Sequence, residues 1–292
     1  MDAFEYAAPR TLDEAYGLIT NGKTTAILAG GTDIIVQLRE NRRHAQQVVD
    51  LKHIPELMAF GFTADGTLEI GAATSCAELY ENAEVARRLP GLVDAASLIG
   101  GIQIQSRASL GGNICNASPA ADSAPALIAL GAQCVIGSKT GKRTIPVEQM
   151  FVGPGRNALQ PGELLLQVRI PPQPKNSAVF FHRFIPRNEM DIAVVNVGVR
   201  LELDDAGQRI TGARVAVGAA APTPLLVAEA ANALVGQAPG PEAFARAAEA
   251  ASAATTPITD MRGSIAQRKH LAKVLTTRAL DGALKRIREV RS

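Results

Sequence analysis

The sequence predicts a protein of mixed helices and strands, and three observations carry this prediction. A strand, a glycine-rich turn, a helix and a second strand follow one another within residues 24–51, which is an α/β arrangement. From residue 163 onward, apolar and polar residues alternate over long runs that are typical of strands. Beyond Pro224 the chain is rich in alanine and carries apolar residues at helical spacing.

The composition is that of a globular protein and argues against several functional classes. Of the 292 residues, 47% are hydrophobic and 20% are charged, and the formal net charge is +2. Nucleic-acid binding is not expected, because base stacking needs aromatic residues among cations and the aromatic content is 4% with no Trp. The first residues lack the apolar segment of a signal peptide, and no apolar run reaches the roughly 20 residues of a membrane span, so we expect a cytoplasmic protein.

Cysteine and histidine spacing predicts no metal centre. Cys76, Cys115 and Cys134 are too far apart for a C-x-x-C pair, and an iron–sulfur cluster needs about four thiolates. We expect the three cysteines to be small buried residues in a reducing compartment. The four histidines show none of the spacings of zinc motifs.

Two capping patterns and a glycine turn organise the first half of the chain. Thr11 followed by Glu14 is a capping box that starts a helix, and Ser75 followed by Glu78 is a second one. The glycine turn at 29–33 separates a buried strand from a helix. The elements expected in this half are strands at 24–28, 46–51 and 67–72, helices at 10–19, 34–40, 75–100 and 124–132, and a hairpin at 132–147.

The second half is predicted as a set of long strands followed by helices. Three prolines, Pro171, Pro172 and Pro174, mark the best boundary, so we expect one domain at 1–174 and another at 175–292. The elements expected here are strands at 163–172, 178–185, 192–203 and 210–220, and helices at 241–254 and 264–290.

The stretch "ILAGGTDI" (Ile27 to Ile34) is the first candidate site. A strand that ends in Gly-Gly and passes into a helix exposes consecutive backbone N–H groups, which together with the helix dipole suit a phosphate. Thr32 and Asp33 could cap the helix or bind polar groups nearby. The alternative is a tight strand–helix turn with Asp33 near the N-cap. The stretch is neither a Walker loop nor a G-x-G-x-x-G fingerprint, and the formal match at 153–158 lies in a loop.

The stretch "SLGGNICNASPAADSAP" is the second candidate site. Gly111 and Gly112 lower the cost of unusual dihedrals and allow another molecule to approach closely. Ser109 and Asn113 flank this second glycine turn and could hold the other side of a diphosphate, and Asp122 could fix a sugar hydroxyl or a ring N–H. The alternative is a glycine-rich bend between buried segments. The residues alone therefore predict an α/β protein that binds a diphosphate-containing cofactor.

The two glycine motifs together resemble those of the FAD-binding subunits of the xanthine dehydrogenase family of molybdenum hydroxylases. The medium subunits of carbon monoxide dehydrogenase and of nicotinate and quinoline oxidoreductases are relatives. The stretches "GPGRNALQPGELLLQVRIPPQPK" and "FFHRFIPRNEMDIAVVNVGVRLEL" also resemble this family, so the likeness covers nearly the whole chain. "GGNICN" and "APTP" are most similar to bacterial xanthine dehydrogenases.

The resemblance implies a fold and a set of cofactor contacts. The fold is α+β: a two-lobed FAD-binding domain of the vanillyl-alcohol-oxidase type, with the lobes meeting near 52–58, and a small C-terminal domain of sheet plus helices. Of the single positions, Asp122 is implied as a cofactor contact, Leu165 lies near the isoalloxazine, Arg183 stands where several relatives have lysine, and Ile99 stands where some place an aromatic residue. The two motifs supply the remaining implied FAD contacts, which are Ile27, Leu28, Ala29, Gly30, Gly31, Thr32, Asp33 and Ile34, then Ser109, Leu110, Gly111, Gly112 and Asn113.

The resemblance also implies a function in which no side chain of this chain is catalytic. FAD is the cofactor, and electrons reach it through a small [2Fe–2S] subunit and leave to NAD+ or another acceptor. A large molybdenum-pterin subunit oxidises a purine, another N-heterocycle or an aldehyde, and the assembly is a dimer of heterotrimers. Two alternatives stay open: a free-standing FAD-dependent reductase, and an assembly module without cofactor. The intact glycine pairs argue against the second.

Overall fold

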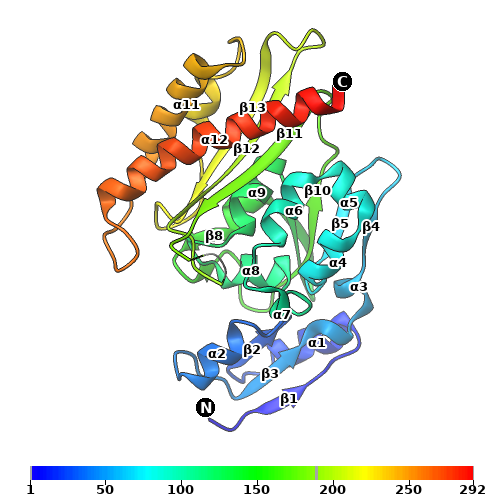
Figure 1. Cartoon of the computed structure of the whole chain (residues 1–292). Helices are drawn as coiled ribbons and strands as arrows, with labels where there is room; N and C mark the ends of the chain where they lie inside the picture. The colour runs from blue at the N-terminus through cyan, green and yellow to red at the C-terminus, as the bar shows by residue number, and fades with distance from the viewer. Residues whose placement is uncertain (1, 188–189, 292) are drawn as a thin grey trace.

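The computed structural model describes residues 2–187 and 190–291. The chain forms three units that follow one another along the molecule in Figure 1. We call them the N-terminal lobe (residues 2–50), the middle lobe (60–170) and the C-terminal domain (177–291). The predicted mixture of helices and strands is confirmed, and no helix of the described residues is long and apolar enough to cross a membrane.

The N-terminal lobe is a small parallel sheet with helical connections. Its strands lie in the order β1 (Glu5–Ala7), β3 (Gln47–Asp50), β2 (Thr25–Leu28), and both neighbouring pairs are parallel. Parallel neighbours need crossover connections, and the chain supplies α1 (Leu12–Ile19) before β2 and α2 (Ile34–Arg39) after it. The strand–turn–helix–strand unit expected at 24–51 is therefore present.

The middle lobe is built on a five-stranded antiparallel sheet. In spatial order the strands are β4 (Phe60–Phe62), β5 (Leu68–Gly71), β10 (Leu164–Ile170), β6 (Gln133–Ser138) and β7 (Gly141–Pro146). Strand β10 comes last in the sequence yet pairs in the centre, because its near-continuous run of buried leucine, valine and isoleucine needs cover on both faces. The predicted hairpin β6–β7 is present.

Several short helices pack around this sheet. Segment η1 (Leu51–His53) and helix α3 (Pro55–Met58) link the two lobes. The helical stretch expected at 75–100 is three helices, because Asn82 caps a new helix and Pro90 starts another. The helices that follow the link are α4 (Cys76–Glu81), α5 (Ala83–Arg88), α6 (Pro90–Ala96), α7 (Ile102–Gln105), α8 (Leu110–Asn116) and α9 (Ser123–Leu130). The segment η2 (Val147–Met150) and the hairpin β8 (Phe151–Gly153) and β9 (Arg156–Asn157) complete the lobe.

Both predicted capping patterns start helices, one of them in the full reciprocal form. The Ser75 hydroxyl accepts from the backbone N of Glu78 at 3.2 Å, and the Glu78 carboxylate accepts from the backbone N of Ser75 at 3.0 Å. Thr11 likewise accepts from the backbone N of Glu14 at 3.2 Å. The Glu14 carboxylate, however, accepts from the backbone N of Arg10, one residue before the cap.

The second glycine motif is a helix, which corrects the prediction of a turn. Ser109 is the N-cap of α8 and accepts from the backbone N of Gly112 at 3.0 Å. The glycines occupy the first helical turn because the helix packs closely there: a Cβ on Gly111 would overlap the backbone of Ala72. The helix ends at Ala117, which has left-handed dihedrals with φ 49°.

The C-terminal domain is an antiparallel sheet between two layers of helices (Figure 1). Helices α11 and α12 cover one face, and α9 of the middle lobe covers the other. Valines of β12 alternate toward the helical side, whereas Gly198 of the same strand leaves no room for a side chain against the Pro125 carbonyl. The elements are β11 (Ser177–Phe184), β12 (Val195–Leu203), β13 (Ile210–Gly218), β14 (Leu225–Leu226), α10 (Ala228–Asn232), α11 (Pro241–Ala254) and α12 (Ile265–Arg291).

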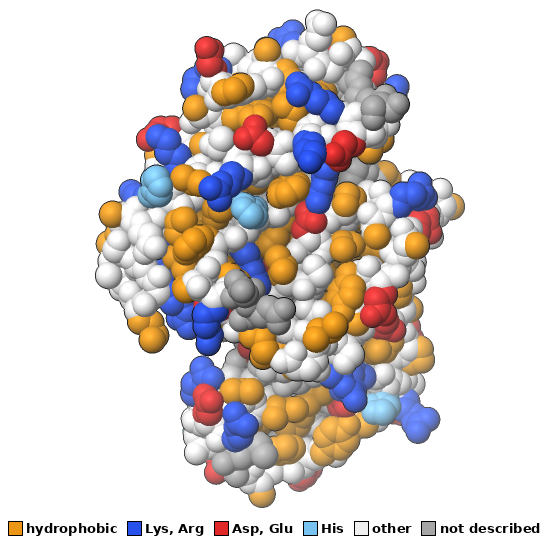
Figure 2. All heavy atoms as spheres, viewed as in Figure 1, with side chains coloured by type: hydrophobic (Ala, Val, Ile, Leu, Met, Phe, Trp, Pro, Cys, Tyr) orange, Lys and Arg blue, Asp and Glu red, His pale blue; other side chains and the backbone are white. Residues whose placement is uncertain are grey.

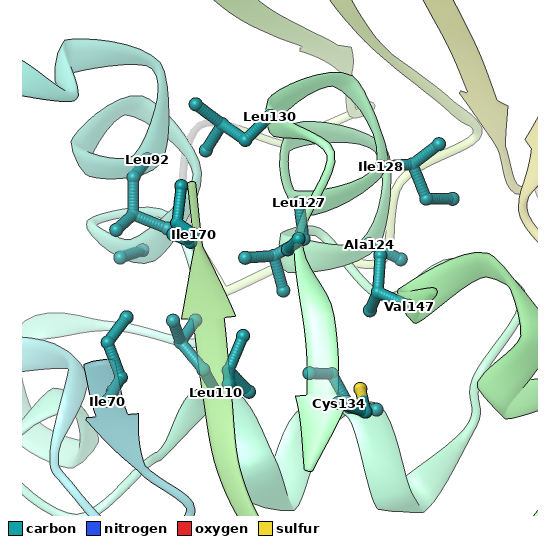
Figure 3. Packing of buried hydrophobic residues seen from close by; sticks show 14 of the residues in the cluster. Ile70, Leu92, Leu110, Ala124, Leu127, Ile128, Leu130, Cys134, Val147 and Ile170 are labelled. Carbon is teal, nitrogen blue, oxygen red and sulfur yellow. The ribbon is translucent and has the colours of Figure 1, made fainter. Parts of the chain in front are cut away.

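The apolar core of the middle lobe lies between its sheet and α9 (Figure 3). Leu127 of α9, Ile170 of β10 and Leu92 of α6 meet there with all three side chains fully buried. Figure 2 shows basic and acidic side chains interspersed over the visible face, with a notch between the N-terminal lobe and the rest of the molecule.

Candidate cofactor site

A cavity of about 290 Å³ is lined by residues of both the N-terminal lobe and the middle lobe. Both glycine motifs contribute to its wall. The lining residues are Ile27, Ala29, Gly30, Gly31, Thr32, Asp33, Ile34, Gln37, Arg43, Leu51, Ala72, Ile99, Ala108, Ser109, Gly111, Gly112, Asn113, Cys115, Asn116, Asn157, Leu159, Glu163, Leu164 and Leu165. Most of the residues expected from the sequence are thus brought together, and their contact with a cofactor stays a prediction.

The first wall is the turn between β2 and α2. Gly31 has φ +80°, a conformation that favours glycine. Gly30 must be small because a Cβ there would overlap the carbonyl of Arg107, so the first glycine motif packs against the backbone just before the second. Asp33 is the N-cap residue of α2 but makes no side-chain capping bond.

Lys52 holds the backbone of this turn in place by a hydrogen bond, a role that the sequence did not predict. Its ammonium donates to the carbonyl oxygen of Ala29 at 2.9 Å and to the Asp50 carboxylate at 2.7 Å. The Tyr6 hydroxyl donates to the other oxygen of that carboxylate at 2.7 Å. Burial would raise the pKa of Asp50, but the hydrogen bonds from Lys52 and Tyr6 outweigh it and hold the pKa below its usual value. The carbonyl before Gly30 is therefore held by a buried ion pair.

The second wall is α8, whose side-chain amides are oriented by neighbours. The Ser123 hydroxyl donates to the amide oxygen of Asn113 at 2.6 Å, which leaves the amide NH2 of Asn113 for other partners. Across the cavity, Gln37 of α2 donates to the amide oxygen of Asn116 at 2.9 Å. This bond ties the two walls directly to each other.

The third wall is β10 and the loop before it. The Asn157 amide donates to the carbonyl of Cys115 at 2.7 Å and fixes the loop against α8. Arg143 binds the Glu163 carboxylate with two bonds of 2.7 Å, so this acid is already paired. This wall contributes Leu159, Leu164 and Leu165 to the cavity lining, and Ile99 is another apolar residue of the lining.

Four of the cofactor contacts expected from the sequence lie in the described part of the chain but outside the cavity lining. Leu28 and Leu110 belong to the apolar cores of their lobes. Asp122 and Arg183 form an ion pair in which both side chains are at least nine-tenths buried, and Asn196 donates to Asp122 at 3.0 Å. Burial raises the pKa of Asp122 even though Arg183 and Asn196 lower it. In this structure the pair joins the middle lobe to the C-terminal domain.

Three ionisable groups in the lining have shifted pKa values, and the first is Glu163, whose pKa is lowered by the hydrogen bonds from Arg143. The Asp33 side chain is solvent-exposed at the surface of the cavity, yet desolvation by the surrounding protein raises its pKa more than the charge of Arg42 lowers it. Burial raises the pKa of the Cys115 thiol to about 12, so it stays protonated at neutral pH. Cys76 and Cys134 are buried as expected, but Cys115 lines the cavity, which the sequence did not predict.

Several lining residues were not predicted from the sequence, and two of them, Cys115 and Asn116, lie inside the second quoted stretch. Gln37 is one helical turn beyond Asp33, and Asn116 is one turn beyond Gly112, so helical periodicity from each motif could have found them. The other missed residues are Arg43, Leu51, Ala72, Ala108, Cys115, Asn157, Leu159, Glu163 and Leu164.

The lining fits a dinucleotide flavin. Backbone N–H groups, neutral amides and one arginine suit a diphosphate and polyol, and the leucines and Ile99 suit an apolar ring system. Within residues 2–187 and 190–291 no group of three His, Cys, Asp or Glu side chains could hold a metal ion.

Comparison with known proteins identifies the family. Residues 2–173 match the model for the FAD binding domain in molybdopterin dehydrogenase, and residues 180–283 match that for the CO dehydrogenase flavoprotein C-terminal domain. The chain is 32% identical over 284 residues to the xanthine dehydrogenase FAD-binding subunit of Escherichia coli O157:H7, covering 97% of both chains. It is 30% identical over 282 residues to the carbon monoxide dehydrogenase medium chain of Hydrogenophaga pseudoflava, covering 96% of both.

Solved structures agree with the family models. Carbon monoxide dehydrogenase of Hydrogenophaga pseudoflava superposes with a TM-score of 0.93 at 30% identity over 98% of both chains. Quinoline 2-oxidoreductase of Pseudomonas putida 86 superposes with a TM-score of 0.90 at 28% identity, again over 98% of both. The expected two-part fold is therefore confirmed, and the chain belongs to the FAD-binding subunits of the xanthine dehydrogenase and CO dehydrogenase family of molybdenum hydroxylases.

Proposed function

We propose that this chain carries FAD between a [2Fe–2S] partner subunit and a soluble electron acceptor, NAD+ or another, in a molybdenum hydroxylase complex. The observation that carries the proposal is the cavity in which both glycine motifs of the family face the same space. Bound FAD supplies the redox chemistry, and the protein contributes binding, orientation and electrostatics.

Each wall of the cavity has a separate task in this proposal. The turn at Gly30 and Gly31 and the cap at Ser109 hold the diphosphate and ribityl with backbone and hydroxyl groups. Leu165 and Ile99 pack on the ring system and limit its contact with water. Asp122 of the middle lobe and Arg183 of the C-terminal domain support the ring region through their buried ion pair.

The partners follow from the subunit character of the relatives. We propose a small [2Fe–2S] subunit as electron donor and a large molybdenum-pterin subunit that oxidises a purine, N-heterocycle or aldehyde. The complex is then a cytoplasmic dimer of heterotrimers. Relatives of similar length are named as FAD-binding subunits or medium chains, which supports a division of labour among chains.

The decisive experiment is purification of the chain alone and together with the products of its neighbouring genes. We expect a yellow protein with the absorption of bound FAD, which copurifies with an iron–sulfur chain and a molybdenum chain. NADH added to the FAD-loaded chain should bleach the flavin if NAD+ is the natural acceptor. A colourless protein that ignores added FAD would contradict the proposal.

The same preparation separates the alternatives. A free-standing reductase would turn over a small substrate without any partner chain, whereas the subunit requires its iron–sulfur partner to receive electrons from substrate. An assembly module would copurify with the partners but without flavin. Substrate oxidation by the three chains together, absent when this chain is omitted, is the expected result.

A further inference from the structure

Arg43 reaches the cavity because the end of α2 turns the chain back. Asn41, the residue after the C-cap Glu40, adopts left-handed dihedrals with φ 54°. The backbone N–H groups of Arg42 and Arg43 then both donate to the carbonyl of Gln37, at 2.9 and 3.2 Å. This is the bond pattern of a helix C-cap with a left-handed residue, and it brings Arg43 beside Gln37 in the cavity lining.

The charge balance of the cavity singles out Arg43. Three of the described lining residues are charged, and Arg43 alone is positive. Glu163 is paired with Arg143 at 2.7 Å, whereas Asp33 forms no ion pair within the described part of the chain, although the charge of Arg42 acts on it. A diphosphate entering this cavity would be repelled by the Asp33 carboxylate, and Arg43 is the lining residue whose charge opposes that repulsion.

The guanidinium of Arg43 has no hydrogen-bond or ion-pair partner among the described residues, so it is free to bind a ligand. Its neighbour Arg42 is held by Glu40 at 2.7 Å, whereas no hydrogen bond or ion pair engages the Arg43 side chain within residues 2–187 and 190–291. An arginine fork can bind two phosphate oxygens at once, which a backbone N–H cannot do.

We propose that Arg43 is a direct contact for the diphosphate of a dinucleotide bound in this cavity. The proposal deepens the proposed function and rests on it, because it takes the cavity to be the cofactor site. Two dinucleotides carry this group: the flavin itself and a nicotinamide acceptor. Arg43 contacts whichever diphosphate lies beside Gln37 and Asp33.

The test compares three variants of the full chain. Arg43→Gln removes the charge, Arg43→Lys keeps it without the fork, and Arg39→Gln removes an exposed charge that is outside the cavity lining. FAD affinity of the flavin-stripped chain is measured by quenching of flavin fluorescence at low and high salt. We expect Arg43→Gln to weaken binding about tenfold or more at low salt, with a smaller loss for Arg43→Lys and none for Arg39→Gln. The difference should shrink near 1 M salt, where charges are screened.

A second arm separates the two sources of diphosphate. If Arg43→Gln binds FAD like wild type but binds NADH about tenfold more weakly in the FAD-loaded form, the contact is with the nicotinamide dinucleotide. Equal affinity of wild type and Arg43→Gln for both ligands would overturn the assignment. Failure of the wild-type chain to bind FAD would overturn both the proposed function and the assignment of Arg43. This outcome is distinct from failure of the Arg43 assignment alone, in which the wild-type chain binds FAD and Arg43→Gln binds both ligands equally well.

Discussion

Two residues outside the cavity lining, Lys52 and Asp50, hold the backbone of the turn between β2 and α2. The carbonyl of Ala29 is fixed by Lys52, which in turn is held by Asp50. Because the peptide is trans, fixing this carbonyl also fixes the direction of the Gly30 N–H on its opposite side. The geometry of the first glycine motif thus depends on a lysine that follows the next strand along the chain.

The stability lost on replacing Asp50 should depend on pH in a defined direction. The pKa of this carboxyl is lowered in the folded state, so its contribution is present above the usual pKa and is lost as pH falls through the folded value. We expect Asp50→Asn to lower the free energy of unfolding by about 1–3 kcal/mol at pH 7 and by less at pH 3. Urea unfolding at both pH values measures this, and an equal loss at each would contradict it.

Gly111 is constrained by the protein itself and not by a ligand alone. The sequence predicts that its small size lets another molecule approach, and the structure shows that the Ala72 backbone is already there. Gly111→Ala should therefore cost about 1–3 kcal/mol in the flavin-stripped chain, measured by urea unfolding. Gly17→Ala in α1 is the control, because nothing lies within 4 Å of its Cβ and the change should be neutral or stabilising. A Gly111→Ala chain as stable as wild type would refute this explanation.

At the scale of elements, the two helix caps of the middle lobe form one unit. Ser75 and Ser109 face each other in an antiparallel bridge, and the backbone N of Cys76 donates to the carbonyl of Ala108 at 2.7 Å. Helices α4 and α8 therefore start side by side. Ser109 at the start of α8 lines the cavity, whereas Ser75 at the start of α4 does not.

This pairing gives a matched experiment on the caps. Ser75→Ala and Ser109→Ala should each lower the free energy of unfolding by about 1 kcal/mol through loss of the capping bond. Only Ser109→Ala should also weaken FAD binding, because Ser109 is in the cavity lining and Ser75 is not. Urea unfolding and flavin fluorescence titration measure the two effects. Equal FAD affinity in both variants would show that the α8 cap is structural only.

At the scale of the whole molecule, partly buried hydrogen bonds and ion pairs join the C-terminal domain to the middle lobe. Arg286 of α12 binds both oxygens of Asp94 of α6, at 2.6 and 2.8 Å, and donates to the carbonyl of Val179 at 2.7 Å. Its guanidinium also lies 4.4 Å from the ring centre of Phe180. Together with the pair of Asp122 and Arg183, these contacts make one continuous structure of the two parts.

Loss of Arg286 should weaken the contact between the C-terminal domain and the middle lobe without changing the cavity lining, to which Arg286 does not belong. We expect Arg286→Ala to lower the free energy of unfolding by about 1.5–3 kcal/mol and to speed proteolysis in the linker at 171–176. Lys285→Ala, a neighbouring exposed position paired loosely with Glu289 at 3.8 Å, should change stability by less than about 0.5 kcal/mol. Unchanged proteolysis of Arg286→Ala would show that the junction depends on apolar packing instead.

Local chemistry made much of this protein predictable from its sequence. Capping boxes, alternating strands and the glycine pairs are properties of a few neighbouring residues, and the helices and strands expected from them are largely present. Short segments without a pattern, such as β1, were missed because their pairing is decided by β3, which lies far along the chain. The continuous helix expected at 75–100 was wrong because Asn82 and Pro90 start new helices.

The sequence by itself determined most of the elements and the family, since each depends on a pattern within one short run of neighbouring residues. Only the tertiary structure decided that the second motif is a helix held against Ala72, that Asp122 is paired with Arg183, and that β10 lies in the centre of its sheet. It also brought Gln37 and Arg43 into the same cavity as the motifs. The physical reason is that close packing, burial and ion pairing join residues distant in sequence, and their energies depend on neighbours that no local pattern records.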